Sequence, residues 1–469
     1  MHLKKFLGGV GILLVATFVV KGLGFLYKIP LGNFLGKENL GSYQLVFPIF
    51  ALCLNLTSSA FPCAIASMGN EEGFLYTSDK VLHFLGILGS AILFLSSGLL
   101  GYLANNQDLT YLLMIISPAV YFCARISYYR GKSQLNLNFK TTALTEICEQ
   151  GIKIIFGTIF LLLFKWQKRA LYLSVFAVVL AQAVALMVAK RGDLKAKKGD
   201  LRSFSLIKRV APITFSHSFP AFVLSVEGIL SARVIGTATY GLYSGVALVI
   251  FSIPALLSSS VSTVIVPKIS NGKGGFCLKA VLFCILTSIP FCAVYLFMPK
   301  SVISTLFFNL SLESVESVAQ ILRAGFVIPF LQCVSILSSA ILYGKKQGGK
   351  VFLSSLISGI VKIVALTLGL VLYKNVLVVV YSSLLQYSLA VAINLIYIIK
   401  ESKVNFNVNT FGKLFLYGTL IFLSVYLASS LTSAQFGLVI AVVSCLFALV
   451  YFAHNLNIIN IFNVKKERK

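Results

Sequence analysis

Long apolar stretches, separated by short polar connections, run along the whole of this chain of 469 residues. Clear examples are Leu171–Ala189, Val351–Tyr373 and Leu414–Ala428. Because a hydrocarbon core of about 30 Å is crossed by ~20 helical residues, stretches of this length predict transmembrane helices. They are too long and too continuously apolar for the alternating strands of roughly 10 residues that build a membrane barrel. We therefore expect an all-α integral membrane protein.

The same length criterion predicts about 14 transmembrane helices over the whole chain. The predicted spans lie near residues 6–27, 43–66, 81–103, 109–129, 143–164, 170–189, 208–230, 240–266, 278–298, 318–342, 351–373, 376–399, 412–430 and 434–454.

Two halves of the chain share short motifs in the same order. Leu40–Gln44 matches Tyr240–Ser244, and Tyr129–Gln134 is echoed by Tyr343–Gln347. Six helices per repeat preserve the orientation of each helix, so the repeat is predicted to be parallel, with its axis along the membrane normal. Transporters commonly pair lobes in this way, with the substrate path between them.

This repeat predicts two six-helix lobes followed by two extra helices. We expect the N-terminal lobe at residues 1–190 and the C-terminal lobe at 208–400. A basic cytoplasmic linker at 191–207 joins them, and residues 401–469 carry the two extra spans and a basic cytoplasmic tail.

Composition and charge support a membrane protein. Hydrophobic residues make up 58% of the chain and charged residues only 12%, whereas soluble domains carry roughly 25% charged residues. The net charge of +26 is concentrated between the apolar stretches, most densely in Lys190–Arg209. With the N-terminus inside, 27 Lys and Arg residues fall in cytoplasmic segments and eight outside. The bias predicts that both termini are cytoplasmic and argues against nucleic-acid binding.

No motif for metal, nucleotide or covalent chemistry stands out. The nine cysteines form no CxxC pair and the four histidines no HExxH motif, so neither a disulfide framework nor a zinc site is indicated. Gly344–Lys350 imitates a phosphate-binding loop, but Val351 stands where that motif requires Ser or Thr. We expect no cofactor, no nucleotide and no enzymatic activity.

Charged residues inside the predicted spans are the candidates for function, because a charge at the bilayer centre costs about 2.5–3.5 kcal/mol and normally faces a cavity or a partner. Glu149 and Lys153 lie one helical turn apart and partly neutralise each other. A cavity lined by Lys and Arg attracts anions such as phosphate; a purely structural ion pair is the alternative. The candidates are Lys21, Arg125, Glu146, Glu149, Lys153, Glu227, Arg323 and Lys362.

Several ordered blocks resemble the SpoVB/MurJ-like polysaccharide flippases of the multidrug/oligosaccharidyl-lipid/polysaccharide (MOP) exporter superfamily. The blocks are Lys21–Leu31 with Leu35–Gln44, the helix Ala143–Lys153, the eighth span from Tyr240 to Pro267, and Ala340 to Lys362. In the helix block, Lys153 replaces the family's Arg. The resemblance covers most of residues 10–400.

The resemblance implies two lobes around a central cavity and the flipping of an undecaprenyl-(di)phosphate-linked saccharide to the outer leaflet by alternating access. It also implies that cations of the first helix, here Lys21 and Lys28, meet the phosphate. The predicted partners are this lipid-linked saccharide and the bilayer of the bacterial cell membrane. A coupling ion, Na⁺ or H⁺, or the membrane potential would drive transport. Our substrate-contact candidates are Lys21, Lys28, Arg125, Lys153 and Lys362, with Glu149 and Glu227 assigned to ion coupling or charge balance.

Two other functions stay open from the sequence. One is a cation-coupled multidrug exporter of the same superfamily, for which a carboxylate such as Glu227 would be indispensable. The other is a non-transporting membrane scaffold in wall or spore-envelope synthesis, which would tolerate neutralisation of all the charges in the spans.

Overall fold

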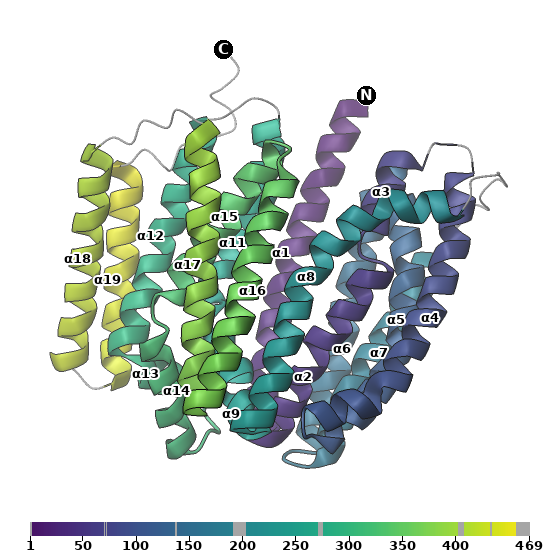
Figure 1. Ribbon diagram of the computed structural model, residues 1–469. Helices are drawn as coiled ribbons and strands as arrows, with labels where there is room; N and C mark the ends of the chain where they lie inside the picture. The colour runs from purple at the N-terminus through teal and green to yellow at the C-terminus, as the bar shows by residue number, and fades with distance from the viewer. Residues whose placement is uncertain are drawn as a thin grey trace. The chain divides into compact units, whose positions relative to one another are not determined.

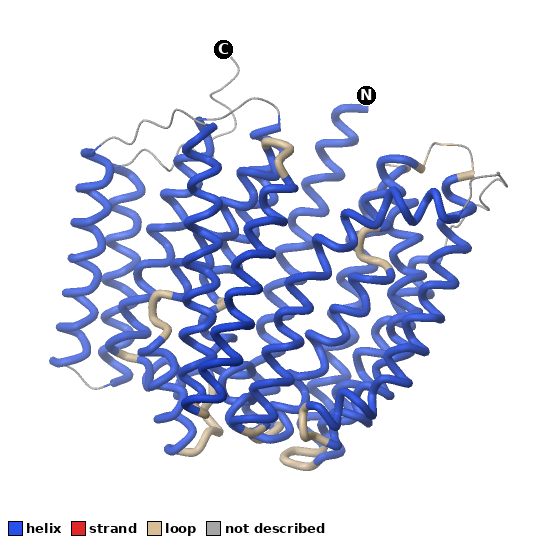
Figure 2. The backbone as a smooth tube through the Cα atoms, in the orientation of Figure 1, coloured by secondary structure: helices blue, strands red, loops and turns tan. Residues whose placement is uncertain are grey.

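The computed structural model describes residues 2–455 apart from 70, 72, 137, 191–202, 271–274, 402–407 and 432–433, and these described residues form helices and no strand (Figure 1, Figure 2). Two compact units, Met1–Gly245 and Val246–Lys469, divide the chain. The first unit contains α1 (His2–Phe34), α2 (Lys37–Thr57), α3 (Phe61–Met68), α4 (Phe74–Leu103), α5 (Gln107–Leu135), α6 (Phe139–Leu163), α7 (Lys168–Lys190), α8 (Ser203–Ile235) and α9 (Thr237–Leu242).

A π-helical turn, η1 (Tyr243–Ala247), lies at the boundary between the units. The second unit contains α10 (Leu248–Phe251), α11 (Ile253–Ser270), α12 (Gly275–Phe297), α13 (Pro299–Leu306), α14 (Leu312–Ala324), α15 (Ile328–Gly344), α16 (Gly348–Tyr373), α17 (Val376–Glu401), α18 (Val408–Leu431) and α19 (Ala434–Asn455). The predicted lobes at 1–190 and 208–400 stay a prediction.

Every predicted span coincides with a helix or a bent pair of helices. Eight described stretches are long and apolar enough to cross a membrane. Three further spans are bent pairs, with angles of 53° in Thr237–Ser262, 99° in Val281–Leu306 and 52° in Leu312–Gly344. The remaining predicted spans correspond to α1, α6 and α19. The chain is thus an all-α, multi-pass membrane protein.

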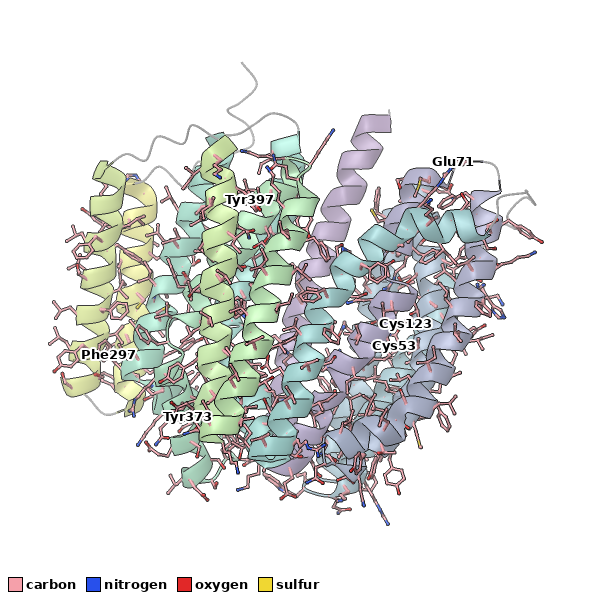
Figure 3. All side chains as sticks on the ribbon, in the orientation of Figure 1. Cys53, Glu71, Cys123, Phe297, Tyr373 and Tyr397 are labelled. Atoms are coloured by element: carbon pink, nitrogen blue, oxygen red, sulfur yellow. The ribbon has the colours of Figure 1, made fainter. Side chains whose placement is uncertain are left out.

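Large apolar side chains cover the outside of these helices (Figure 3). Leu95 on α4 is 80% exposed, and Phe447 on α19 is 75% exposed. A soluble protein rarely exposes such continuous apolar surface, whereas in a bilayer these side chains meet lipid tails.

Each unit has its own apolar core. In the first unit, α4 packs along α5, and α6 lies between α1 and α7. One cluster of this unit joins α3, α4 and α5 to the beginning of α8 through Ile65, Leu82 and Leu206. In the second unit, α11, α12, α15 and α17 enclose Ile265, Leu337 and neighbouring residues.

The repeated motif begins within α2 and within α9, and the residue before each helix has the same backbone conformation. Gly36 precedes α2 with φ 74° and ψ 156°, and Gly236 precedes α9 with φ 87° and ψ 149°. This region of conformational space is open essentially to glycine alone. Local backbone structure therefore follows the sequence repeat at both positions.

Candidate functional site

The parallel helices α1 and α6 bring three of the predicted lysines into one region of the first unit. Their contacts run in the same order along both helices: Lys21 interacts electrostatically with Glu146, and further along Lys28 interacts with Lys153. The two helices pack closely along much of their length. The α1–α6 lysine cluster is therefore Lys21, Lys28 and Lys153.

A glycine notch fixes the spacing of α1 and α6 at this cluster. The phenol of Tyr27 fills the space beside Gly157, where an added Cβ would lie 2.6 Å from Tyr27 Cζ. The Nζ atom of Lys153 lies 5.9 Å from the centroid of the Tyr27 ring, within range of a cation–π interaction. The ring thus holds the Lys153 ammonium near α1.

Within the cluster, the ammonium groups of Lys28 and Lys153 lie near each other. The Lys153 ammonium is close enough to Lys28 for repulsion, and it is also attracted by the Glu149 carboxylate. Lys153 is the fifteenth of the 25 residues of α6, so its charge lies near the middle of a span. A charge at that depth is unfavourable without an anion nearby, and the Glu149 carboxylate supplies one for Lys153.

The Glu149 carboxylate is held by two neighbouring helices. Its Oε2 lies 2.9 Å from Nη2 of Arg130 on α5, and its Oε1 accepts a hydrogen bond of 2.8 Å from Gln182 on α7. The Nε atom of Arg130 donates to the hydroxyl of Thr145 over 3.0 Å. These contacts support charge balance more than ion coupling for Glu149, and its assignment to either role stays a prediction.

Arg130 and Gln182 were not among the residues singled out from the sequence. Arg130 falls in the basic segment after the predicted fourth span, where solvent is the expected neighbour. The sequence does contain a signal for this pairing, because α5 and α6 are consecutive helices that form a hairpin. An arginine near the end of the first helix can then reach a carboxylate two to three turns into the second.

Arg125 lies apart from the lysine cluster. Its Nη1 is 2.8 Å from Oδ1 of Asp79 on α4, and its guanidinium lies 5.6 Å and 5.7 Å from the ring centroids of Tyr128 and Tyr129. Glu71, labelled in Figure 3, lies between α3 and α4 and pairs with Arg209 of α8. Asp79 and Glu71 thus each pair with an arginine, and substrate contact by Arg125 stays a prediction.

Glu227 and Lys362 are both buried, in different units. Glu227 on α8 is 3% exposed and interacts electrostatically with the phenol of Tyr240. Lys362 on α16 is 3% exposed and follows the buried Ser354 and Ser358 along one face of that helix. The functional assignments of Glu227 and Lys362 stay predictions.

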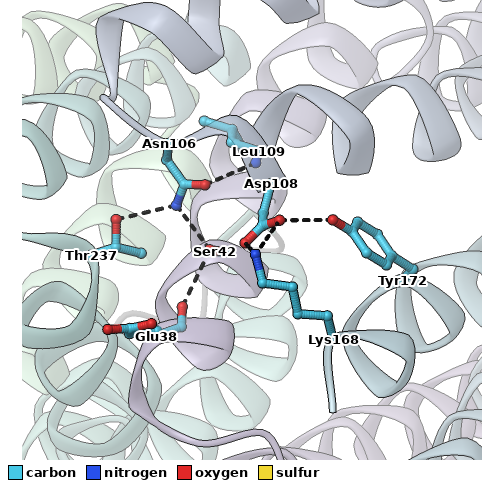
Figure 4. Close-up of polar contacts among 8 residues, drawn as sticks. All are labelled: Glu38, Ser42, Asn106, Asp108, Leu109, Lys168, Tyr172 and Thr237. Carbon is cyan, nitrogen blue, oxygen red and sulfur yellow. Dashed lines mark hydrogen bonds and ion pairs between the residues drawn. The ribbon is translucent and has the colours of Figure 1, made fainter.

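A polar network joins helix ends at the side of the first unit that the charge bias predicts to face outward (Figure 4). Both carboxylate oxygens of Asp108 contact Lys168 Nζ, at 3.1 and 3.0 Å, and the hydroxyl of Tyr172 donates to Asp108 over 2.7 Å. These contacts join α5 to α7. Asn106, beside them, forms a separate set of hydrogen bonds with α2 and α9, and none of these residues was singled out from the sequence.

Known proteins resemble both the sequence and the fold. The model of a family described as polysaccharide biosynthesis protein matches residues 6–273, more than half of the chain. Stage V sporulation protein B of Bacillus subtilis (strain 168) is 27% identical over 309 residues, which cover 58% of this chain and 59% of that protein. Lipid II flippase MurJ of the same organism is 27% identical over 172 residues, covering 33% of this chain and 32% of that protein. The matches therefore span less than two thirds of either relative.

Solved structures extend the similarity to most of the chain. The lipid II flippase MurJ in an inward closed conformation superposes with a TM-score of 0.77 and 17% identity, covering 94% of this chain and 99% of that one. An inward-facing multidrug resistance MATE family transporter of the MOP superfamily gives a TM-score of 0.63 and 13% identity, covering 82% and 96%. At these identities the similarity shows the fold alone.

Proposed function

Because the chain belongs to the polysaccharide biosynthesis protein family and has the fold shared by MurJ and the MATE transporters, we propose that it flips a polyprenyl-phosphate-linked saccharide across the bacterial cell membrane. The saccharide would pass from the inner to the outer leaflet by alternating access. The two termini would be cytoplasmic, with the lobes at residues 1–190 and 208–400. The protein would act as a transporter rather than as an enzyme.

The observation that carries this proposal is the α1–α6 lysine cluster. Its three lysines gather beside two carboxylates, Glu146 and Glu149, and Glu149 is also paired with Arg130. A phosphate or diphosphate would balance the positive charge that remains within this membrane-spanning bundle. Ammonium groups bind phosphate as point charges, without requiring a planar partner. A lipid-linked saccharide supplies such an anion at the junction of its tail and its headgroup.

The second unit, taken by itself, contains an apolar cavity suited to a hydrocarbon chain. It has a volume of about 330 Å³ and lies among α11, α12, α13 and α19. Hydrocarbon groups line it, including those of Phe291, Val294 and Leu446. A cavity of this character accepts part of a hydrocarbon chain and no charged group.

The proposal is tested by reconstitution. Purified protein in vesicles should move a fluorescent polyprenyl-diphosphate saccharide between leaflets, and native mass spectrometry should identify a co-purifying lipid of this class. Lys28→Gln should reduce flipping, whereas Lys374→Gln, which neutralises an exposed lysine at the end of α16, should not. Equal flipping by the two variants would contradict the assigned role of the cluster.

A multidrug exporter is the competing function, and one observation favours it: Glu227 is a buried carboxylate. Export of a cationic dye that depends on Glu227, with no flipping of the lipid-linked saccharide, would establish that alternative. A scaffold would be indicated if neutralising the lysine cluster and Glu227 together left the cellular function intact.

A further inference from the structure

The helices α2 and α9 cross at glycines, with their backbones in contact. An added Cβ on Gly41 would overlap the carbonyl oxygen of Thr237 and lie 2.8 Å from its Cγ2. An added Cβ on Gly241 would overlap the carbonyl oxygen of Lys37 and lie 2.7 Å from the nitrogen of Gly41. The contact is therefore reciprocal: Gly41 meets Thr237, the residue after Gly236, and Gly241 meets Lys37, the residue after Gly36.

Asn106 ties this crossing to the start of α5 (Figure 4). As the N-cap of α5, it accepts a hydrogen bond from the backbone nitrogen of Leu109 over 3.0 Å. Its Nδ2 donates to the hydroxyl of Ser42 on α2 over 2.8 Å and to the hydroxyl of Thr237 on α9 over 3.1 Å. One side-chain amide thus joins three helices, and both of its donor hydrogens are used.

The contacts that hold α9 here differ in kind from those that hold α5 and α7. Lys168 and Tyr172 bind Asp108 through charge-assisted contacts. The contact with Tyr172 is roughly twice as strong as a neutral one, whereas solvent screens that with Lys168, whose side chain is 67% exposed. Asn106 holds α9 through a neutral hydrogen bond. Arg233, near the end of α8, adds one charge-assisted contact, to the Leu103 carbonyl, at a longer distance of 3.3 Å. The crossing is the more easily broken part of this network.

The chain also has a place to bend directly after α9. The π-helical turn η1 (Tyr243–Ala247) follows α9 immediately. Such turns interrupt the regular hydrogen-bond ladder and are frequent at functional sites. Leu40 of α2 packs against Gly245 within this turn, where an added Cβ would lie 2.5 Å from Leu40 Cγ. Separation of α9 from α2 would therefore expose Leu40, which is only 1% exposed.

We infer that the α2–α9 crossing is an outward-facing gate and that Asn106 is its latch. This inference rests on the proposed alternating-access function. Opening requires the bond from Asn106 to Thr237 to break, while the Asp108–Lys168–Tyr172 contacts keep α5 and α7 in place. At Gly41 and Gly241 the closed helices touch through their backbones, so opening there separates backbone from backbone and exposes the side chain of Leu40.

Accessibility of a cysteine beneath the crossing tests the latch without any substrate. Two proteins that carry Leu40→Cys are labelled from outside with a membrane-impermeant maleimide. One retains Asn106 and the other also carries Asn106→Asp. Aspartate keeps the acceptor for Leu109 but loses the donor hydrogens. Thr237→Val, which removes the acceptor hydroxyl at similar size, is the second variant. Each should speed labelling about two- to tenfold, the effect of one neutral hydrogen bond. An unchanged labelling rate in folded Asn106→Asp or Thr237→Val protein would overturn the assignment of Asn106 as the latch.

Crosslinking tests whether the crossing must open during transport. Ser42→Cys with Thr237→Cys should react with a short bifunctional methanethiosulfonate, and flipping should fall at least tenfold and recover with reductant. The parent protein, treated in the same way, controls for the native cysteines. Complete crosslinking with undiminished flipping would show a static brace, and failure to crosslink would show that the two residues are not neighbours. If the parent moves no lipid-linked saccharide, the proposed cargo fails, whereas the labelling result still decides the latch.

Discussion

Replacing Lys153 with glutamine should separate transport from stability. The variant removes a charge at the fifteenth of 25 residues in α6, and with it the repulsion from Lys28. Its attraction to Glu149 is also lost, but that carboxylate keeps Arg130 and Gln182. Burying a charge at this depth costs about 2.5–3.5 kcal/mol on insertion scales. We therefore expect the stability of the empty protein to change by less than about 1 kcal/mol, or to increase.

Transport should respond in the opposite direction. A hydrogen bond to a charged group contributes about 1.5–3 kcal/mol, so loss of the ammonium–phosphate contact should slow flipping by roughly 10- to 150-fold. Lys153→Arg keeps the charge and should retain most activity.

The assay pairs flipping in vesicles with thermal unfolding in detergent, on the same preparations. A Lys153→Gln protein that unfolds several degrees earlier would refute this reasoning, because Lys153 would then be a structural partner of Glu149. Normal flipping by the variant would refute the assignment of Lys153 to the anion site.

Three further outcomes follow from the same structure. Gln107→Cys should react with an impermeant reagent outside intact cells and Ser203→Cys should not, and the reverse result would invert the predicted topology. Lys21→Ala should abolish flipping without loss of the folded protein, whereas Lys21→Arg should keep much of it; normal transport by Lys21→Ala would leave that lysine a structural role. Arg130→Gln should destabilise the protein by about 1–3 kcal/mol, because the Glu149 carboxylate loses its guanidinium partner, and an unchanged unfolding temperature would contradict that pairing.

Much of the fold was predictable because span length and hydrophobicity are local properties. The predicted spans coincide with helices even where the structure bends them, as at Thr237–Ser262. The bends themselves depend on packing and leave only a proline or glycine in the sequence. The spacing of Glu146, Glu149 and Lys153 placed them on one helix face, and the structure turns part of that face toward α1.

The pairing of each cation with its carboxylate could not be predicted in the same way. Arg125 lies within a predicted span and Arg130 beyond its end, so the sequence favoured Arg125 for a role in the membrane. The structure pairs Arg125 with Asp79, outside the lysine cluster, and brings Arg130 to Glu149. Which cation meets which carboxylate depends on how α4, α5 and α6 pack, and hydrophobic patterns contain no such information.

Apart from the Lys168–Asp108 pair at the ends of α7 and α5, the described ion pairs of the first unit suggest a division of labour between its cations. Arg125, Arg130 and Arg209 each contact a carboxylate from another part of the chain, which suits a planar guanidinium with several fixed donors. The α1–α6 cluster consists instead of lysines, whose compact ammonium groups form fewer fixed contacts and adapt to a mobile anion. If this division holds, neutralising an arginine lowers stability before transport, and neutralising a cluster lysine lowers transport before stability. Measuring unfolding and flipping together on both classes of variant therefore tests the site more sharply than either measurement alone.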